Sequence, residues 1–86
     1  MFSGKRERVE IRFIAPLLDT VVDRFGTTGA LYNKLDESHF SISVDVDISD
    51  QFFGWLLGFG KRAKLLSPQP VVEQFAAYID KVREMY

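Results

Sequence analysis

The chain has 86 residues, which allows a single domain, and 47% of them are apolar with 14% aromatic, so general disorder is excluded. The absence of cysteine excludes a disulfide framework, a thiolate metal site and a cysteine nucleophile, and the net charge of −1 disfavours strong electrostatic binding of nucleic acid. No apolar run approaches the roughly 18 residues of a membrane span, and no signal peptide pattern is visible.

The start of the chain predicts a polar lead-in followed by a strand. Residues 1–8 are polar and basic, and we expect a linker end there, as in a domain cut from a longer protein. The stretch Val9–Phe13 alternates apolar and polar residues, which predicts a half-buried strand. Its inward side chains are predicted to be Val9, Ile11 and Phe13.

A helix and a hairpin are predicted next. Pro16 suits the first turn of a helix, and Gly26 suits its left-handed end. The apolar spacing of one helical face runs through Leu18, Val21, Val22 and Phe25. Residues 31–35 form a weak strand with Tyr32 and Lys34 on its outward side, and residues 40–47 alternate without a break. The polar residues 36–39 between them predict a hairpin turn.

The second half of the chain predicts helix, strand and helix. Ser49 is a good N-cap for a helix that ends at Gly58 or Gly60, and residues 61–66 follow as a short strand. Ser67 and Pro68 open the last helix. That helix carries two adjacent apolar stripes, formed by Val71, Phe75, Tyr78, Val82 and Met85 and by Val72, Ala76 and Ile79. A face this wide indicates a helix that is buried on two sides or meets a partner.

The resulting order is βαββαβ followed by a helix, which predicts an α+β fold. We expect a ferredoxin-like sandwich with a four-stranded antiparallel sheet and an additional C-terminal helix. The helices should cover one sheet face and leave the other open. The side chains predicted on the open face are Arg12, Tyr32, Lys34, Ser41, Ser43, Asp45 and Lys64.

Several chemical motifs are present only in part. The glycines from Gly54 to Gly60 have five residues between them and no Ser or Thr after the lysine, so a phosphate-binding loop is disfavoured. The carboxylates Asp45, Asp47 and Asp50 lack the Gly and Glu of a calcium loop. His39 lies in the predicted turn, and the sequence has no serine flanked by glycines that could act as its nucleophile. No metal, cofactor or catalytic residue is expected, and the chain is predicted not to be an enzyme.

An RNA-recognition domain shares the predicted topology. Such domains carry aromatic side chains on the outer face of their two central strands, where bases stack. The outward positions of those strands hold Arg12, Ser41, Ser43 and Asp45, while Phe13 and Phe40 point inward. The base-stacking platform is therefore missing.

One stretch of the sequence is more informative about function than these partial motifs. Trp55-Leu56-Leu57-Gly58-Phe59-Gly60, followed by Ala63–Pro68, resembles the C-terminal end of WYL-domain transcriptional regulators. Arg24-Phe25-Gly26 and a last helix running to Tyr86 match the same family. The resemblance covers roughly residues 8–86 and is to the C-terminal extension, the WCX domain. The turn at residues 36–39 departs from it, since relatives often place Gly after the Asp.

The resemblance implies a bacterial, cytoplasmic regulator whose WCX domain, residues 9–86, follows a helix-turn-helix domain and a WYL domain. It implies roles in forming a homodimer and in completing the pocket for an effector such as a nucleotide or short single-stranded nucleic acid, with no operator contact and no membrane. The expected effector-binding residues are Arg12, Tyr32, Lys34, Ser41, Ser43 and Lys64. The expected interface residues are Tyr78, Val82, Met85 and Tyr86, and the structural motif residues are Trp55, Gly58, Gly60 and Pro68. The alternative is an autonomous ferredoxin-like protein that binds a small molecule.

Overall fold

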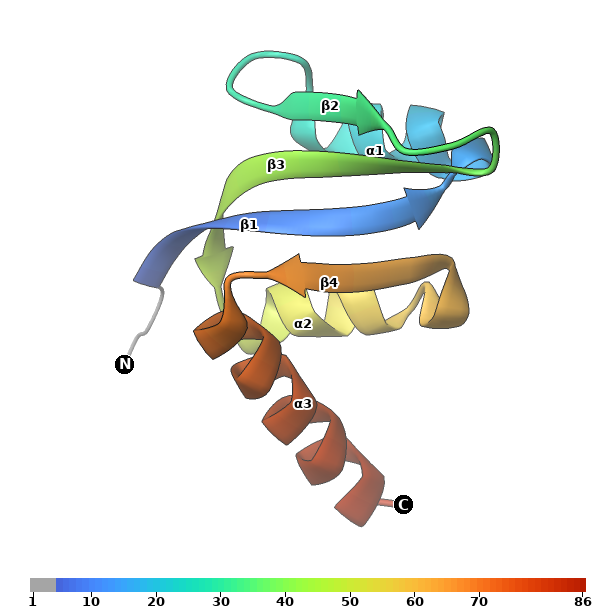
Figure 1. Cartoon of the computed structure of the whole chain (residues 1–86). Coiled ribbons are helices and arrows are strands. Elements are labelled where there is room, and N and C mark those ends of the chain that lie inside the picture. Colours follow the sequence, from blue (N-terminus) through green and yellow to red (C-terminus); the bar gives the residue numbers. More distant parts are fainter. Residues whose placement is uncertain (1–4) are drawn as a thin grey trace.

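A four-stranded antiparallel sheet forms the centre of the molecule (Figure 1). The computed structural model describes residues 5–86, and its strands lie in the order β2-β3-β1-β4. The elements are β1 (Lys5–Ile14), α1 (Leu18–Phe25), β2 (Leu31–Lys34), β3 (His39–Ile48), α2 (Asp50–Leu57), β4 (Ala63–Ser67) and α3 (Gln69–Glu84), with 3-10 turns at Ala15–Leu17 and Gly60–Arg62. The predicted α+β class, antiparallel sheet and additional C-terminal helix are confirmed. The finer description, a ferredoxin-like sandwich, stays a prediction.

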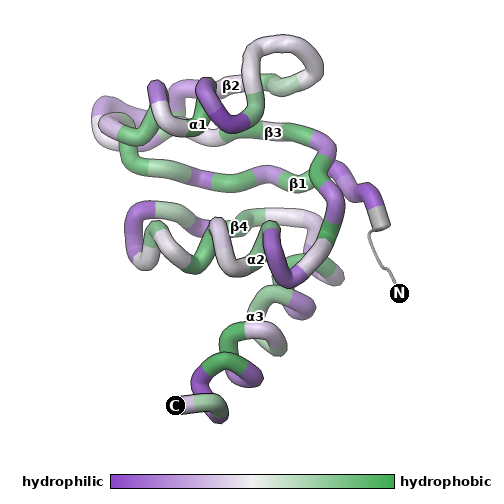
Figure 2. The backbone as a smooth tube through the Cα atoms, turned by 180° about the vertical axis from the view of Figure 1, so that it is seen from behind, coloured by the Kyte–Doolittle hydropathy of each residue, from purple (hydrophilic) through white to green (hydrophobic). Residues whose placement is uncertain are grey.

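The helices are distributed unevenly about the sheet. Helices α1 and α2 lie behind the strands in Figure 1 and in front of them in the reverse view of Figure 2, so both cover the same face. Within residues 5–86 no helix lies on the opposite face, which we call the open face. Helix α3 leaves the end of β4, contacts β4 and α2, and then runs away from the sheet.

The core lies between the sheet and the two helices that cover it. In β1 and β3 the residues directly opposite each other on this side are Val9 and Val44, Ile11 and Ile42, and Phe13 and Phe40. All six side chains are buried, as their alternation predicts. The other buried apolar side chains are Val21, Ala30, Val46, Phe52, Phe53, Leu56, Leu65 and Val71. Leu18, predicted on the apolar face of its helix, is instead 43% exposed.

The two central strands are much longer than their outer neighbours. β1 begins at Lys5 and not at Val9, because its first residues pair with the end of β3 at Asp45–Ile48. Part of the expected lead-in is therefore strand, while residues 1–4 lie outside the described residues. β2 pairs only with residues 40–43 of β3, and β4 pairs only with residues 10–13 of β1. Residues 5–9 and 44–48 thus extend past the outer strands as a two-stranded ribbon.

The ends of α2 follow local chemistry. The Ser49 hydroxyl accepts a hydrogen bond from the backbone N–H of Phe52 at 3.2 Å, the N-cap arrangement that the sequence predicts. The helix ends at Leu57, and Gly58 keeps an ordinary φ of −60°. Gly60 has a φ of +58°, which favours glycine. The next two residues complete a 3-10 turn, so β4 begins at Ala63 and not at residue 61.

Trp55 of α2 lies in a cluster of aromatic rings. Its ring centroid is 4.9 Å from Phe59, 5.4 Å from Phe25 and 6.3 Å from Phe13. The Arg24 guanidinium lies over the indole at 5.5 Å. The indole therefore joins α1, β1 and α2. Pro68, the last of the motif residues, is the N-cap of α3.

Candidate functional site

One row of side chains crosses all four strands on the open face. The register places Asn33 of β2 beside Ser41 of β3, Ser41 beside Arg12 of β1, and Arg12 beside Lys64 of β4. We call Asn33, Ser41, Arg12 and Lys64 the central row. It brings together three of the six effector-binding residues that the sequence predicts.

The cationic half of the central row has no acidic partner in the part of the chain that the structure describes. Arg12 and Lys64 are direct cross-strand neighbours, an arrangement in which like charges destabilise a sheet. Neither takes part in the ion pairs found among residues 5–86. Glu10 shares their face two residues along β1 and forms no ion pair with either. The row is thus suited to an anion that offsets both charges.

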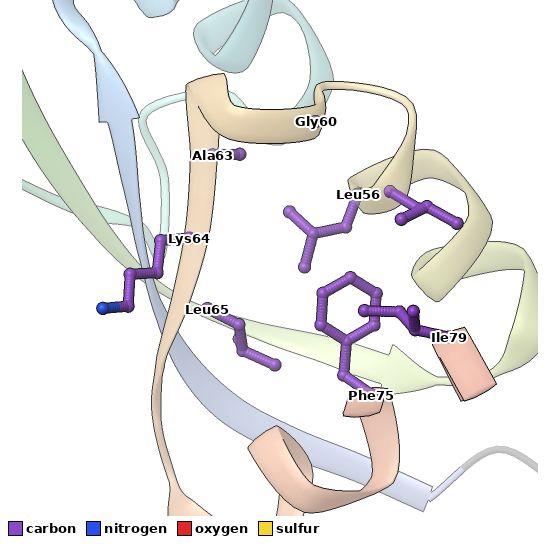
Figure 3. Close-up of a pocket in the computed structure, with 8 residues that line it drawn as sticks. Leu56, Gly60, Ala63, Lys64, Leu65, Phe75 and Ile79 are labelled. Atoms are coloured by element: carbon purple, nitrogen blue, oxygen red, sulfur yellow. The ribbon is translucent and has the colours of Figure 1, made fainter. Parts of the chain in front are cut away.

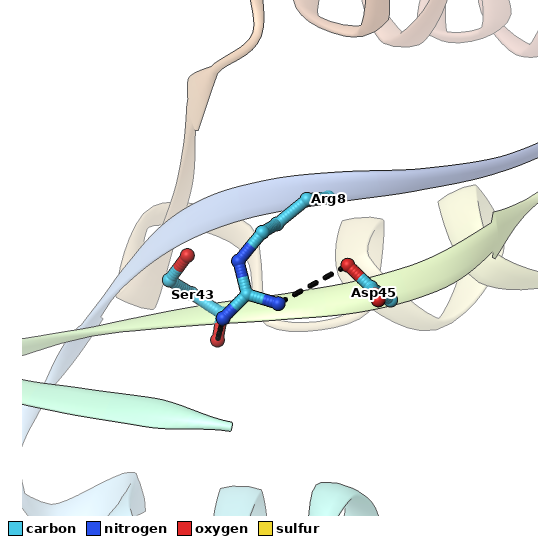
Figure 4. Close-up of polar contacts among 3 residues, drawn as sticks. All are labelled: Arg8, Ser43 and Asp45. Carbon is cyan, nitrogen blue, oxygen red and sulfur yellow. Dashed lines mark hydrogen bonds and ion pairs between the residues drawn. The ribbon is translucent and has the colours of Figure 1, made fainter. Parts of the chain in front are cut away.

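The other arginines of the open face are already paired. Arg8 donates to Asp45 at 3.2 Å and to the Ser43 carbonyl at 3.4 Å (Figure 4), and Arg6 donates to Asp47 at 3.3 Å. The register places Asp45 opposite Arg8 and Ser41 opposite Arg12, so Asp45 is not the cross-strand partner of Arg12. Two of the three aspartates weighed as calcium ligands, Asp45 and Asp47, are bound to arginines instead, which leaves Arg12 available.

Ser41 is buried although it lies on the open face. It is 1% exposed, and its hydroxyl has no hydrogen-bond partner among residues 5–86. Arg12 and Asn33 flank it on the neighbouring strands. A buried hydroxyl without a partner loses its hydrogen bonds to water and gains nothing in return. The Ser41 side chain is therefore the buried member of the central row. Ser43 on the same strand is half-buried.

We expect the substitution Ser41→Ala to stabilise the domain. Removal of an unsatisfied buried hydroxyl should raise the free energy of unfolding by about 1 kcal/mol, which corresponds to a rise of about 4–8 °C in Tm for a chain of this size. Thermal unfolding followed by circular dichroism measures this. Ser43→Ala is the matched control and should change stability by less than about 0.5 kcal/mol. A lower Tm for Ser41→Ala would show that the hydroxyl has a partner.

Tyr32 and Lys34 do not lie on the open face. They are opposite Ile42 and Phe40, which places them on the side that the helices cover. Tyr32 is half-buried against Phe40, its hydroxyl donates to the Gly26 carbonyl at 2.5 Å, and burial raises the pKa of this phenol. The predicted role of Tyr32 and Lys34 on the open face is corrected, and Asn33 takes that place. The polarity of Asn33 is the only sequence signal that could have indicated this.

The hairpin turn holds the single histidine. His39 Nδ1 lies 3.1 Å from Asp36 Oδ1, and the backbone N–H of Ser38 donates to the same oxygen at 2.7 Å. Two hydrogen bonds hold the pKa of the Asp36 carboxyl below its usual value. The backbone N–H of Ser38 has the larger effect, and the His39 side chain has the smaller one. These contacts fix the turn and give His39 a structural partner.

The predicted interface residues lie along the far half of α3 and directly after its end. Tyr78 is half-buried, with its ring centroid 5.6 Å from Phe53, and its hydroxyl approaches Gly54, where an added Cβ would lie 3.3 Å away. Val82 is half-buried, whereas Met85 is 68% and Tyr86 99% exposed. Val71 is the only fully buried residue of the helix. The two apolar stripes are therefore covered only in part within the described chain.

Comparison with protein families decides the identity of the domain. The WCX domain matches residues 5–83, which is nearly the whole chain. The matched range includes all four strands, the aromatic cluster around Trp55 and most of α3. The chain belongs to the WCX domain family. WCX domains are found C-terminal in WYL-domain transcription regulators and are not a catalytic family.

No curated protein matches the chain in a sequence comparison. None of the helices within residues 5–86 combines the length and the apolar character needed to cross a membrane. The WCX match covers the whole described length of β1.

Proposed function

We propose that this WCX domain takes part in effector recognition and dimer formation in a WYL-family DNA-binding regulator. The observation that supports this most directly is the pair of cations Arg12 and Lys64, which lie side by side on the open face and have no ion-pair partner within residues 5–86. A guanidinium can hold a phosphate or carboxylate through two parallel hydrogen bonds, and an adjacent ammonium adds charge. The proposed effector is anionic, such as a nucleotide or a short single-stranded nucleic acid.

The proposed partners within the regulator are its WYL and helix-turn-helix domains. The WYL domain supplies the other part of the effector pocket, and the helix-turn-helix contacts the operator. The net charge of −1 agrees with a domain that does not itself read DNA. Such a regulator acts in the bacterial cytoplasm. Binding of the effector by the isolated domain should be weak, because only one wall of the pocket is present.

The test uses the full-length regulator and a short single-stranded DNA oligonucleotide as the effector probe. Arg12→Ala should leave folding, dimer formation and basal operator affinity unchanged. It should raise the oligonucleotide concentration needed for half of the maximal change in operator affinity by about tenfold, as expected for loss of about 1.4 kcal/mol of effector binding. Fluorescence anisotropy of labelled operator DNA, titrated with the oligonucleotide, gives this concentration.

Arg6→Ala is the matched control. It removes the same charge from the same face of β1, but from a guanidinium already bound to Asp47. Its effector response should equal that of the parent. An unchanged response in Arg12→Ala, or an equal loss in both variants, would remove Arg12 from the effector site and leave bulk charge or architecture as its role.

We expect the 86-residue chain to dimerise at millimolar concentration through the far half of α3. Met85 and Tyr86 expose apolar surface that a second copy can cover. Light scattering should show mass above that of the monomer, and Met85→Glu should return it to the monomer by placing charge in the contact. The control Gln74→Glu adds a charge near the start of α3 and should leave the dimer intact. A strict monomer at millimolar concentration would contradict this proposal.

A further inference from the structure

An apolar pocket opens between β4, α2 and α3. Its volume is about 300 Å³, and its side chains gather from the three elements (Figure 3). The residues that line it are Leu56, Leu57, Gly60, Ala63, Lys64, Leu65, Phe75 and Ile79. Leu56 and Leu65 form a buried floor, and Ile79 is 37% exposed at the rim. The pocket lies apart from the exposed end of α3 at Met85 and Tyr86.

The pocket reaches the main chain at the outer edge of β4. Three consecutive residues, Ala63, Lys64 and Leu65, line it, although successive strand side chains point to opposite faces. In Figure 3 the Lys64 side chain points away from the other side chains. Its main chain is therefore what borders the pocket. β4 is at the edge of the sheet, and within residues 5–86 no backbone hydrogen bond from another element reaches its outer side.

A strand added to this edge would find two different environments. It would lie about 4.8 Å from β4 and accept and donate main-chain hydrogen bonds. Its alternate side chains on one face would enter the apolar pocket between Leu56, Leu65 and Phe75. Those on the other face would lie beside Lys64 and extend the central row by one strand. The pattern that fits is apolar residues alternating with polar ones.

The positive charge around the open-face side of β4 indicates which polar residues the added strand should carry. Arg12 and Lys64 already lie side by side in the central row, and Lys61 and Arg62 precede β4 in the adjoining 3-10 turn. Arg62 is held in place by its Nε donating to the Phe59 carbonyl at 3.1 Å, with its guanidinium 5.6 Å from the Phe59 ring. None of these four cations has a carboxylate partner within residues 5–86. A carboxylate would offset this charge.

We propose that the outer edge of β4 binds an extended segment of a partner polypeptide in which apolar residues alternate with acidic ones. The segment adds a fifth strand, places its apolar side chains in the pocket and directs its carboxylates to Lys64 and Arg12. This inference goes beyond the proposed function, since it requires neither the anionic effector nor the α3 contact.

A second folded copy of the chain does not supply this segment. The matching pattern in its own sequence is Val44-Asp45-Val46-Asp47-Ile48 of β3. Val44 and Val46 are 7% exposed in the core of their own domain. Asp45 and Asp47 are bound to Arg8 and Arg6. The apolar and acidic side chains of that stretch are therefore already occupied, which favours a different polypeptide as the partner.

The test titrates the isotope-labelled 86-residue chain with the synthetic peptide acetyl-Val-Glu-Val-Glu-Val-amide and follows amide chemical shifts. We expect saturable shifts concentrated at residues 63–67 and in the pocket. N-methylation of the amides that face β4 should weaken binding by about tenfold, the effect of losing about 1.4 kcal/mol. The peptide with Lys in place of Glu should weaken it similarly. Equal binding of the N-methylated peptide would overturn strand addition.

Two variants on α3 serve as a matched pair. Ile79→Glu places a charge at the exposed rim of the pocket and should abolish saturable binding, while Ala77→Glu, which is exposed and does not line this pocket, should retain it. Lys64→Glu should weaken binding of the acidic peptide and strengthen that of the lysine peptide. Shifts confined to other strands, equal effects of the α3 variants, or concentration-dependent shifts at β4 without peptide would each overturn the proposal.

Discussion

Trp55→Ala is expected to yield a largely unfolded protein. Truncating a packed aromatic side chain costs about 3–5 kcal/mol, and a small domain has a total stability of about 5 kcal/mol or somewhat more. The loss removes the ring contacts of Trp55 with Phe13, Phe25 and Phe59, and the Arg24 guanidinium loses one of its two aromatic partners. Far-ultraviolet circular dichroism during thermal unfolding measures the remaining structure.

Tyr86→Ala is the control for this substitution. It removes an aromatic side chain that is 99% exposed, and it should change the free energy of unfolding by less than about 0.5 kcal/mol. A cooperative transition of Trp55→Ala within a few degrees of the parent would contradict the prediction. It would mean that α1 and β1 pack against each other without the indole between them.

Gly26→Ala should destabilise the domain by about 1–3 kcal/mol through the backbone alone. Gly26 follows α1 with φ 72° and ψ −167°, a region that is essentially restricted to glycine. An added Cβ would meet no atom within 4 Å, so a steric clash makes no contribution. The residue also joins two elements, because its N–H donates to Val22 and its carbonyl accepts from Tyr32. Chemical denaturation of both proteins gives the difference.

Thr27→Ala provides the comparison for Gly26→Ala. Thr27 is exposed and follows Gly26 directly in the chain, so its truncation should alter stability by less than about 0.5 kcal/mol. An equal effect of the two substitutions would show that the loop relaxes to an ordinary backbone conformation. In that case the backbone strain expected from the substitution Gly26→Ala would be absent.

The alternation of the central strands made much of the fold predictable. Phe40, Ile42, Val44 and Val46 repeat with a period of two, and this repeat requires a strand with one buried face. The same argument placed Val9, Ile11 and Phe13 in the core, where the structure has them. Ser49 could be recognised as an N-cap because its side chain satisfies a donor that any helix start leaves free.

The residues of β2 indicated its open face only weakly, through the polarity of Asn33. The strand has only four residues and lies at the sheet edge, where both faces are partly exposed. Leu31 and Leu35 suggested the wrong inward set, since they are 61% and 47% exposed. The hairpin decides the register instead, as the N–H groups of Leu35 and Asp36 donate to the His39 carbonyl.

Whether Arg12 pairs with an aspartate likewise depends on the register between β1 and β3. Alternation places Arg12 and Asp45 on the same face, but it does not say which residues of two strands are opposite each other. The pairing of β1 with β3 includes residues 5–8, which were expected to precede the fold. Arg8 therefore takes the Asp45 carboxylate, and Arg12 lies opposite a serine.

The ribbon formed by residues 5–9 and 44–48 makes each central strand an edge strand along half of its length. Backbone amides of one strand should therefore differ in hydrogen exchange, with slow exchange where four strands pair and fast exchange at alternate ribbon positions. The exposed edges also invite pairing with other chains. The charged side chains of Arg6, Arg8, Asp45 and Asp47 along this segment oppose such aggregation, so substituting them with valine would convert a protected edge into a template for fibrils.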